Sequence, residues 1–255
     1  MNSQQPEPPA QGPIPGGAAA TPPSDLPAAF PPLPYPVLFS NAQVLAINKP
    51  IGVAAIPEGA NDTICLRTKL EAALGTKIFV VHRLDKDVSG VIIFARDAET
   101  HRFLNLQFSE RLVHKTYLAL VRGVLNRAQG KIPTPLREFG SGRMGVDREH
   151  GKPSVTRYRV RERFPAHTLL EVEPLTGRRH QIRVHLYSIG FPIEGDPRYG
   201  DVAQQRACPR LMLHAAAIAL PLPGGETVRI EAPMPATFQK ILADLRANSP
   251  GSLRD

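Results

Sequence analysis

Short apolar runs separated by turn residues dominate the chain from residue 36 onward. Two of them, 78–81 and 91–95, are β-branched or aromatic and almost uninterrupted, which predicts strands buried on both faces of a sheet. Alternating or apolar segments predict further strands at 43–49, 113–123, 155–163, 168–174, 211–220 and 227–232.

Helical spacing occurs in four places between or after these strands. A helix over 62–74 is expected to end at Gly75, and a helix from Asp97 to about Arg111 is expected to use Asp97 as its N-cap. A short helix is predicted just after the Gly177 turn and a last one over 236–247. Residues 126–154 are rich in Gly, Pro and charge, which predicts a loop or a peripheral insertion.

The first 36 residues contain twelve of the 27 prolines, together with runs of Ala and Gly. Such a segment has too little apolar surface to fold alone. We therefore predict a disordered tail at 1–35, one globular domain at 36–247 and a flexible C-terminus at 248–255.

Charge is distributed unevenly along the chain. The net charge is +8 over 255 residues, but no Lys or Arg precedes Lys49, so residues 49–255 carry +10. A body this basic suits a polyanionic partner, with nucleic acid as the first candidate, although basic residues also serve solubility.

The two cysteines, Cys65 and Cys208, fit no metal-ligand spacing and favour a reducing compartment over a disulfide framework. No apolar run approaches the roughly 18 residues of a transmembrane helix, and the first residues lack the pattern of a secretory signal. We expect a cytoplasmic protein that does not bind a membrane.

The segment from His82 to Gly90 connects the two most apolar runs. It is nine residues long and holds two carboxylates, an arginine, a lysine and a histidine. Charge at the end of a buried sheet is costly unless it is paired or used. Because Asp, Ser and Gly also suit turns, spacing alone leaves a polar turn and a functional loop equally open.

The sequence His82-Arg83-Leu84-Asp85, followed by Ser89-Gly90, resembles the active-site signature of the RluA-type pseudouridine synthases. Four further segments resemble the same family in the same order: Asn48–Gly52, Lys115-x-Tyr117, Thr176–Leu186 and the loop 192–200. One departure is Val88, where the family usually has Thr; this removes a hydroxyl that could support the loop but does not touch the nucleophile.

The resemblance implies roles for individual residues. Asp85 would be the catalytic nucleophile, Arg183 would pair with it, and Tyr117 would stack on the uracil and could assist proton removal from carbon. Arg83 would fill the space left by the flipped-out base. Many relatives carry an S4-type RNA-binding domain near the N-terminus; we expect this chain to belong to the branch without one.

The strand over 155–163 places arginines on alternate positions: Arg157, Arg159, Arg161 and Arg163. Such a face is either a solvated surface or a phosphate-binding track, and we favour the track because like charges in a row repel unless an anion lies over them. We expect phosphate contacts from Arg157, Arg159, Arg178 and Arg179.

His180 and His185 are five residues apart, on different faces of a helix, and no Cys or Glu completes a site, so we expect no metal. We expect no cofactor either, because the family's reaction consumes none.

The predicted architecture is a single α+β domain, a long, bent and mostly antiparallel sheet with flanking helices and a central cleft. The predicted function is isomerisation of uridine to pseudouridine in ribosomal RNA, transfer RNA or both, by a monomer. Two alternatives stay open: an inert RNA-binding protein on the same fold, with Val88 as its hint, and a carboxylate-based glycosidase or nucleosidase, which the basic body disfavours.

Overall fold

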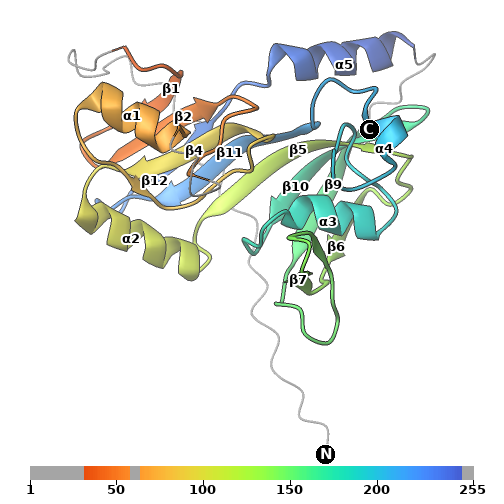
Figure 1. The fold of residues 1–255 in the computed structure, drawn as a ribbon, viewed down its shortest axis with the longest axis horizontal. Helices are drawn as coiled ribbons and strands as arrows, with labels where there is room; N and C mark the ends of the chain where they lie inside the picture. Colours follow the sequence, from red (N-terminus) through yellow and green to blue (C-terminus); the bar gives the residue numbers. More distant parts are fainter. Residues whose placement is uncertain (1–31, 58–63, 249–255) are drawn as a thin grey trace, which may run out of the picture.

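A computed structural model describes residues 32–57 and 64–248, which form one α+β domain around a twisted ten-stranded sheet (Figure 1). From one edge the strands follow the order β1-β2-β4-β11-β5-β10-β9-β6, with β3 paired to β4 and β12 paired to β11. The strands are β1 Val37–Ser40, β2 Val44–Lys49, β3 Phe79–Val80, β4 Ser89–Ala95, β5 His114–Arg122, β6 Gln129–Ile132, β9 Thr156–Arg163, β10 His167–Pro174, β11 Leu213–Pro221 and β12 Thr227–Glu231. Every pairing is antiparallel except that of β4 with β11, so the predicted mostly antiparallel sheet is confirmed.

Helices flank the sheet in the described part of the chain: α1 Leu66–Leu74, α2 Ala98–Ser109, α3 Gln181–Ser188, α4 Val202–Gln205 and α5 Ala236–Ala247. Helix α2 begins where predicted, because the Asp97 carboxylate accepts the Thr100 N–H at 2.7 Å. Helix α1 ends at Gly75, which has φ 65°. It begins at Leu66, later than predicted; the expected first residue, Asp62, lies outside the described residues.

Strand β4 is buried over its whole length, as its apolar sequence predicts. Strand β3 is only two residues long and half-buried, so the prediction of a strand over 78–81 buried on both faces was wrong. The reason is its position: β3 pairs only with the end of β4, Phe79 opposite Ala95, and has no neighbour on its other side.

Residues 126–154 are more structured than the predicted loop. Strand β6 extends the main sheet beyond β9, and β7 Leu136–Glu138 pairs with β8 Met144–Val146 in a separate hairpin. These strands have three or four residues each and include two glycines, which is too short a pattern to signal a strand in the sequence.

The two faces of the sheet near β9 and β10 are distinguished by their helices, so we call them the α3 face and the α5 face. Thr156 and Tyr158 lie on the α3 face, where Thr156 contacts α3. Glu162 lies on the α5 face, where it binds Arg246 of α5 at 2.6 Å. The two helices lie on opposite sides of the sheet in Figure 1.

The prediction that Arg163 shares a face with Arg157 and Arg159 was wrong. The register of β9 against β10 shifts between Leu169 and Leu170, which leaves Arg161 as a bulge and reverses the alternation after it. Arg163 consequently lies on the other face and donates to the Leu125 carbonyl at 2.9 Å.

The proposed tail at 1–35 and C-terminus at 248–255 fall almost entirely outside the described residues. Within the described part, no helix has both the length and the apolar character needed to cross a membrane.

Candidate active site

The loop that carries Asp85 lies between β3 and β4 and is closed by backbone hydrogen bonds. The Val88 N–H donates to the Asp85 carbonyl at 3.0 Å, and the Gly52 N–H donates to the Lys86 carbonyl at 2.9 Å. Lys49 is fully buried and its Nζ donates to the Lys86 carbonyl at 3.1 Å. The Asn48–Gly52 segment thus holds the Asp85 loop in place through the Lys86 carbonyl.

Val88 lies in the hydrophobic core with 2% of its surface exposed. Its side chain needs no hydrogen bond there, and its backbone N–H closes the turn. The loop therefore forms without the hydroxyl that Thr would supply. Val88 thus gives no reason to expect an inert protein.

The loop leads into the only parallel pairing of the described sheet, in which Ser89 lies opposite His214 and Gly90 opposite Ala215. The Ser89 Oγ is 2.9 Å from His214 Nδ1 and accepts from Arg210 Nη2 at 2.7 Å. Gly90 has φ 119°, and a Cβ there would lie 2.1 Å from the Ala215 carbonyl oxygen, so only glycine fits.

Arg183 on α3 connects two carboxylates. Its Nε and Nη2 each donate to Asp196 at 2.8 Å, and its Nη1 donates to Asp85 Oδ2 at 3.2 Å. Burial alone would lower the pKa of Arg183, but the hydrogen bonds and charges of Asp196 and Asp85 together raise it above its ordinary value. The structure thus brings Arg183 to Asp85 as predicted from the motifs, although Asp85 keeps 20% of its side chain exposed.

The turn before α3 is held by the buried side chain of Gln181. Its Oε1 accepts from the Thr176 hydroxyl at 2.6 Å and from the Arg178 N–H at 3.0 Å, and its Nε2 donates to the Val155 carbonyl at 2.9 Å. Gln181 therefore ties the Thr176–His180 turn to the start of β9 and fixes where α3 begins.

The two histidines of this segment have different surroundings. His185 is fully buried, with Nδ1 2.8 Å from Thr156 Oγ1 and Nε2 2.8 Å from the Thr134 carbonyl, so it joins α3 to the sheet. His180 faces Asp85, with Nε2 3.7 Å from Oδ2. Within the described residues, no group of three or more His, Cys, Asp and Glu is arranged to hold a metal ion.

Tyr117 on β5 is half-buried on the α3 face of the sheet, opposite Val172, which in turn lies opposite Tyr158. Burial and, second, the negative charge of Asp85 raise the pKa of the Tyr117 hydroxyl. The phenol is therefore protonated at neutral pH and lies within electrostatic reach of the carboxylate.

Lys115 and His82 are two further titratable residues near Asp85 and Tyr117 whose pKa values are shifted. Burial lowers the pKa of Lys115, two residues before Tyr117. Burial and the charge of Lys115 lower the pKa of His82 to about 3, and the neutral His82 accepts the Ile93 N–H through Nε2 at 3.0 Å. His82 consequently holds the Asp85 loop against β4 through its Nε2.

The arginines predicted to contact phosphate lie on two sides of the sheet. Arg83 and Arg178 are exposed, and Arg179 pairs with Glu138 of β7. Arg83 is two residues from Asp85 in the chain, and Arg178 and Arg179 directly precede His180, which faces Asp85. Arg157 and Arg159 lie on the α5 face, away from Asp85 and Tyr117, because their β10 partners are Glu173 and Glu171.

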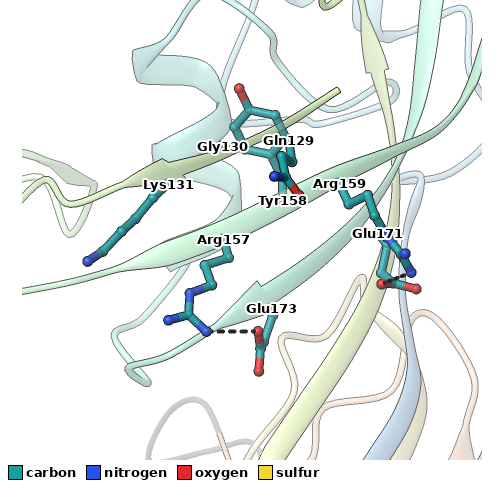
Figure 2. A pocket seen from close by; sticks show the side chains of 8 residues that line it. All are labelled: Gln129, Gly130, Lys131, Arg157, Tyr158, Arg159, Glu171 and Glu173. Atoms are coloured by element: carbon teal, nitrogen blue, oxygen red, sulfur yellow. Dashed lines mark hydrogen bonds and ion pairs between the residues drawn. The ribbon is translucent and has the colours of Figure 1, made fainter. Parts of the chain in front are cut away.

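A shallow hollow on this α5 face is lined by Gln129, Gly130, Lys131, Arg157, Tyr158, Arg159, Glu171 and Glu173. In Figure 2 Arg157 and Arg159 reach toward Glu173 and Glu171, at 3.8 Å and 2.9 Å, whereas Tyr158 points the other way. The premise that these arginines need an external anion was therefore wrong, since the neighbouring strand supplies two carboxylates.

Asp196 is the main residue that sequence reasoning missed. The Pro192–Gly200 segment was interpreted as a turn-rich loop, yet the Asp196 carboxylate also accepts the Arg198 and Tyr199 N–H groups at 2.8 Å and 3.1 Å. The available signal was the segment's resemblance to the family pattern, which pointed to a role without saying what the acid binds.

Comparisons with known proteins identify the family of this chain. Residues 43–188 match the family model of RNA pseudouridylate synthase. The chain is 39% identical to ribosomal large subunit pseudouridine synthase D of Xanthomonas campestris pv. campestris, with 85% of this chain and 71% of the relative covered. It is also 39% identical to ribosomal large subunit pseudouridine synthase C of Escherichia coli strain K12, with 82% and 70% covered.

Among solved structures, human RNA pseudouridylate synthase domain containing 1 superimposes with a TM-score of 0.69 at 27% identity, covering 88% of this chain and 99% of the other. Domain containing 4 gives a TM-score of 0.68 at 26% identity, covering 82% and 92%. The chain therefore belongs to the RNA pseudouridylate synthase family, as its RluA-type motifs predict, and is a pseudouridine synthase, an isomerase.

Proposed function

We propose that the chain converts a specific uridine in ribosomal RNA to pseudouridine with Asp85 as its nucleophile. The observation that carries this proposal is the carboxylate of Asp85, which is partly exposed and lies 3.2 Å from the Nη1 of a buried arginine, Arg183. The choice of ribosomal RNA is supported by the names of the similar proteins, which are large subunit synthases.

The contacts of Asp85 suggest which of its oxygens reacts. Arg183 and His180 both face Oδ2, and Oδ1 makes no hydrogen bond or ion pair with the described residues. A nearby cation keeps a carboxylate ionised and hence nucleophilic. Oδ1 is therefore the oxygen that adds to the nucleotide, either at the sugar carbon or on the base ring.

The reaction is balanced within the substrate. The bond from the sugar carbon to uracil nitrogen breaks, the detached ring turns, and a bond from the same sugar carbon to a ring carbon forms. The new carbon–carbon bond leaves one proton in excess on that ring carbon, and this proton is lost while the freed nitrogen gains one. No electrons are exchanged with another molecule.

Tyr117 would stack on the uracil and remove that proton. Burial and, second, the charge of Asp85 raise the pKa of its hydroxyl, so the hydroxyl stays protonated while Asp85 is free. If Asp85 is esterified in a covalent adduct, its negative charge disappears. The part of the Tyr117 pKa shift that this charge causes then disappears as well. Tyr117 then becomes a better base at the stage at which the carbon must lose its proton.

The base must leave its stack to reach Asp85, which costs a few kcal/mol. Arg83 is exposed beside Asp85, so it can occupy the vacated space. Arg178 and Arg179 would bind phosphates at the cleft. Arg157 and Arg159 would contact a more distant part of a large folded RNA, because they lie on the α5 face.

The test is a comparison of purified RNAs as substrates. Unmodified large subunit ribosomal RNA and transfer RNA transcripts are incubated with the protein, and pseudouridines are mapped by carbodiimide labelling and primer extension. We expect new pseudouridine in the ribosomal RNA. Modification confined to transfer RNA would refute the choice of substrate, and absence of any new pseudouridine in either RNA would refute the proposal.

A further inference from the structure

Tyr199 and His180 are joined by a hydrogen bond, and the other ring nitrogen of His180 faces Asp85. Tyr199 is buried, with 1% of its surface exposed, and its hydroxyl accepts the Met144 N–H at 3.2 Å. The same hydroxyl is 3.0 Å from His180 Nδ1. Among the described residues Nδ1 is the sole acceptor within reach of the Tyr199 proton, and a buried hydroxyl proton without an acceptor is costly.

This arrangement determines which ring nitrogen of His180 carries hydrogen. Because Nδ1 accepts from Tyr199, the hydrogen of a neutral imidazole must be on Nε2. Nε2 is the atom that faces Asp85 Oδ2, at 3.7 Å. The donor therefore points at the carboxylate from a little beyond hydrogen-bond length, a spacing that catalytic contacts often show before substrate closes the site.

The backbone holds His180 in this place. His180 is the N-cap of α3 and has φ 52°, a left-handed conformation that turns the chain between Arg179 and Gln181. Its ring packs edge-on against Tyr199 with 5.8 Å between the centroids. The side chain keeps only 8% exposure, so few other orientations are open to it.

His180 is neutral at physiological pH. Its pKa is lowered to about 4: burial has the largest effect, the charge of Asp85 acts against it, and the charges of Arg183, Arg179 and Arg198 act in the same direction as burial. Arg183 is thus the cation that compensates Asp85, and His180 contributes a dipole instead of a second positive charge.

We propose that His180 is a positioning residue, whose Nε2–H donates to Asp85 Oδ2 when RNA is bound, with Tyr199 fixing its tautomer. This proposal rests on the nucleophilic role proposed for Asp85. Arg183 and His180 together saturate Oδ2 from two directions, which fixes the plane of the carboxylate and directs Oδ1 to the substrate. A neutral second donor orients the carboxylate without the loss of nucleophilicity that a second cation would cause.

The matched variants are His180→Gln, whose side-chain amide can still donate near the position of Nε2, and His180→Leu, which cannot. Both substituted residues must adopt the left-handed backbone conformation of position 180, so any backbone strain is similar in the two variants. A hydrogen bond to a charged group is worth about tenfold to a hundredfold in rate. We expect His180→Leu to lose that factor in single-turnover rate at saturating RNA, with unchanged RNA affinity, and His180→Gln to recover most of it.

Tyr199→Phe keeps the buried ring and removes only the hydroxyl. We expect it to slow the wild-type protein about tenfold and to have little effect in the His180→Leu background, since both act through one chain. Full additivity of the two losses would overturn the proposal, as would wild-type rates for His180→Leu.

Asp85→Asn is measured beside these variants. Activity in Asp85→Asn would refute the proposed nucleophile, whereas an inactive Asp85→Asn with a fully active His180→Leu would refute only the role of His180. Histidine ring ¹⁵N NMR of the unsubstituted protein, assigned by the loss of one signal in His180→Gln, tests the tautomer independently of folding in the variants. We expect neutral His180 with hydrogen on Nε2; hydrogen on Nδ1, or a doubly protonated ring, would overturn the proposal.

Discussion

Asp196 holds Arg183 through two nitrogens, Nε and Nη2, at 2.8 Å each, and so directs the third, Nη1, at Asp85. The Asp196 side chain is fully buried and Arg183 has 2% exposure. A bidentate contact of this kind fixes the guanidinium plane as well as its charge. The position of the cation beside the proposed nucleophile is therefore set by a residue that does not touch Asp85.

We predict that Asp196→Asn destabilises the fold by about 3 to 5 kcal/mol, because it removes the fully buried carboxylate that holds the buried Arg183 through two nitrogens. It should also reduce turnover, since Arg183 can rotate away from Asp85. Urea unfolding and single-turnover assays measure the two effects.

The control for Asp196→Asn is Glu231→Gln, the same kind of change in the exposed pair between Arg229 and Glu231. Glu231→Gln should lower the free energy of unfolding by less than about 1 kcal/mol. Equal losses in the two variants would mean that Arg183 is compensated in some other way.

Gly90 gives a prediction about the parallel pairing beneath the loop. Gly90→Ala should destabilise the protein by about 3 kcal/mol or more, because the new Cβ would lie 2.1 Å from the Ala215 carbonyl and the φ of 119° is strained for alanine. Thermal unfolding compares it with Gly224→Ala, where a Cβ meets nothing within 4 Å. Similar melting temperatures for the two variants would show that β4 and β11 can move apart at Gly90 without loss of stability.

Stability should fall as the pH drops from about 6.5 toward 4. The pKa values of His180 and His82 are lowered from 6.5 to about 4 and about 3, so the unfolded chain binds protons in this range that the folded chain does not. Between pH 6.5 and 4 each histidine changes the free energy of unfolding by at most about 3 kcal/mol, a contribution that is complete above pH 6.5 and decreases as the pH falls.

Urea unfolding at several pH values measures this slope. His180→Gln should make it shallower, and His150→Gln, on an exposed loop, controls for the loss of one histidine. A slope equal in the wild type and His180→Gln would mean that His180 is charged in the folded protein.

The salt dependence of RNA affinity tests whether Arg157 and Arg159, on the α5 face, contact RNA. Affinity for single-stranded RNA falls with a log–log slope of about −0.7 per phosphate neutralised. If Arg157 and Arg159 contact phosphate, replacing both with Ala should flatten that slope by one to two contacts without changing the site modified, because phosphate contacts carry no sequence information.

The matched pair is Arg178→Ala with Arg179→Ala at the cleft. An unchanged slope for the Arg157 and Arg159 variant would remove the α5 face from the RNA interface. It would also identify the pairs with Glu171 and Glu173 as the reason that those arginines are there.

The strands and helices with clear periodicity could be predicted from the sequence. Strand β4 is apolar throughout and Asp97 is an ordinary cap, so local chemistry decides both. Strands β6, β7 and β8 could not be predicted, because their pairing depends on partners elsewhere in the chain rather than on their own few residues.

The residues of the candidate site also differ in how far the sequence could predict them. Asp85, Tyr117 and Arg183 could be named as candidates because motifs carry them. The roles of Asp196 and Tyr199 depend on distances to residues of other segments, such as the 2.8 Å contact from Arg183 Nε to Asp196. The face occupied by Arg163 depends on a bulge, and one extra residue in a strand leaves no mark in an alternating sequence.

The most direct test of the account is pseudouridine formation by Asp85→Asn on large subunit ribosomal RNA, with Asp87→Asn as the control. Asp85→Asn removes a charge without changing shape, and Arg183 remains bound to Asp196, so the fold and the RNA affinity should be nearly unchanged. We expect Asp85→Asn to form no pseudouridine and Asp87→Asn to retain substantial activity. Substantial activity in Asp85→Asn, or loss of activity in Asp87→Asn alone, would contradict the account.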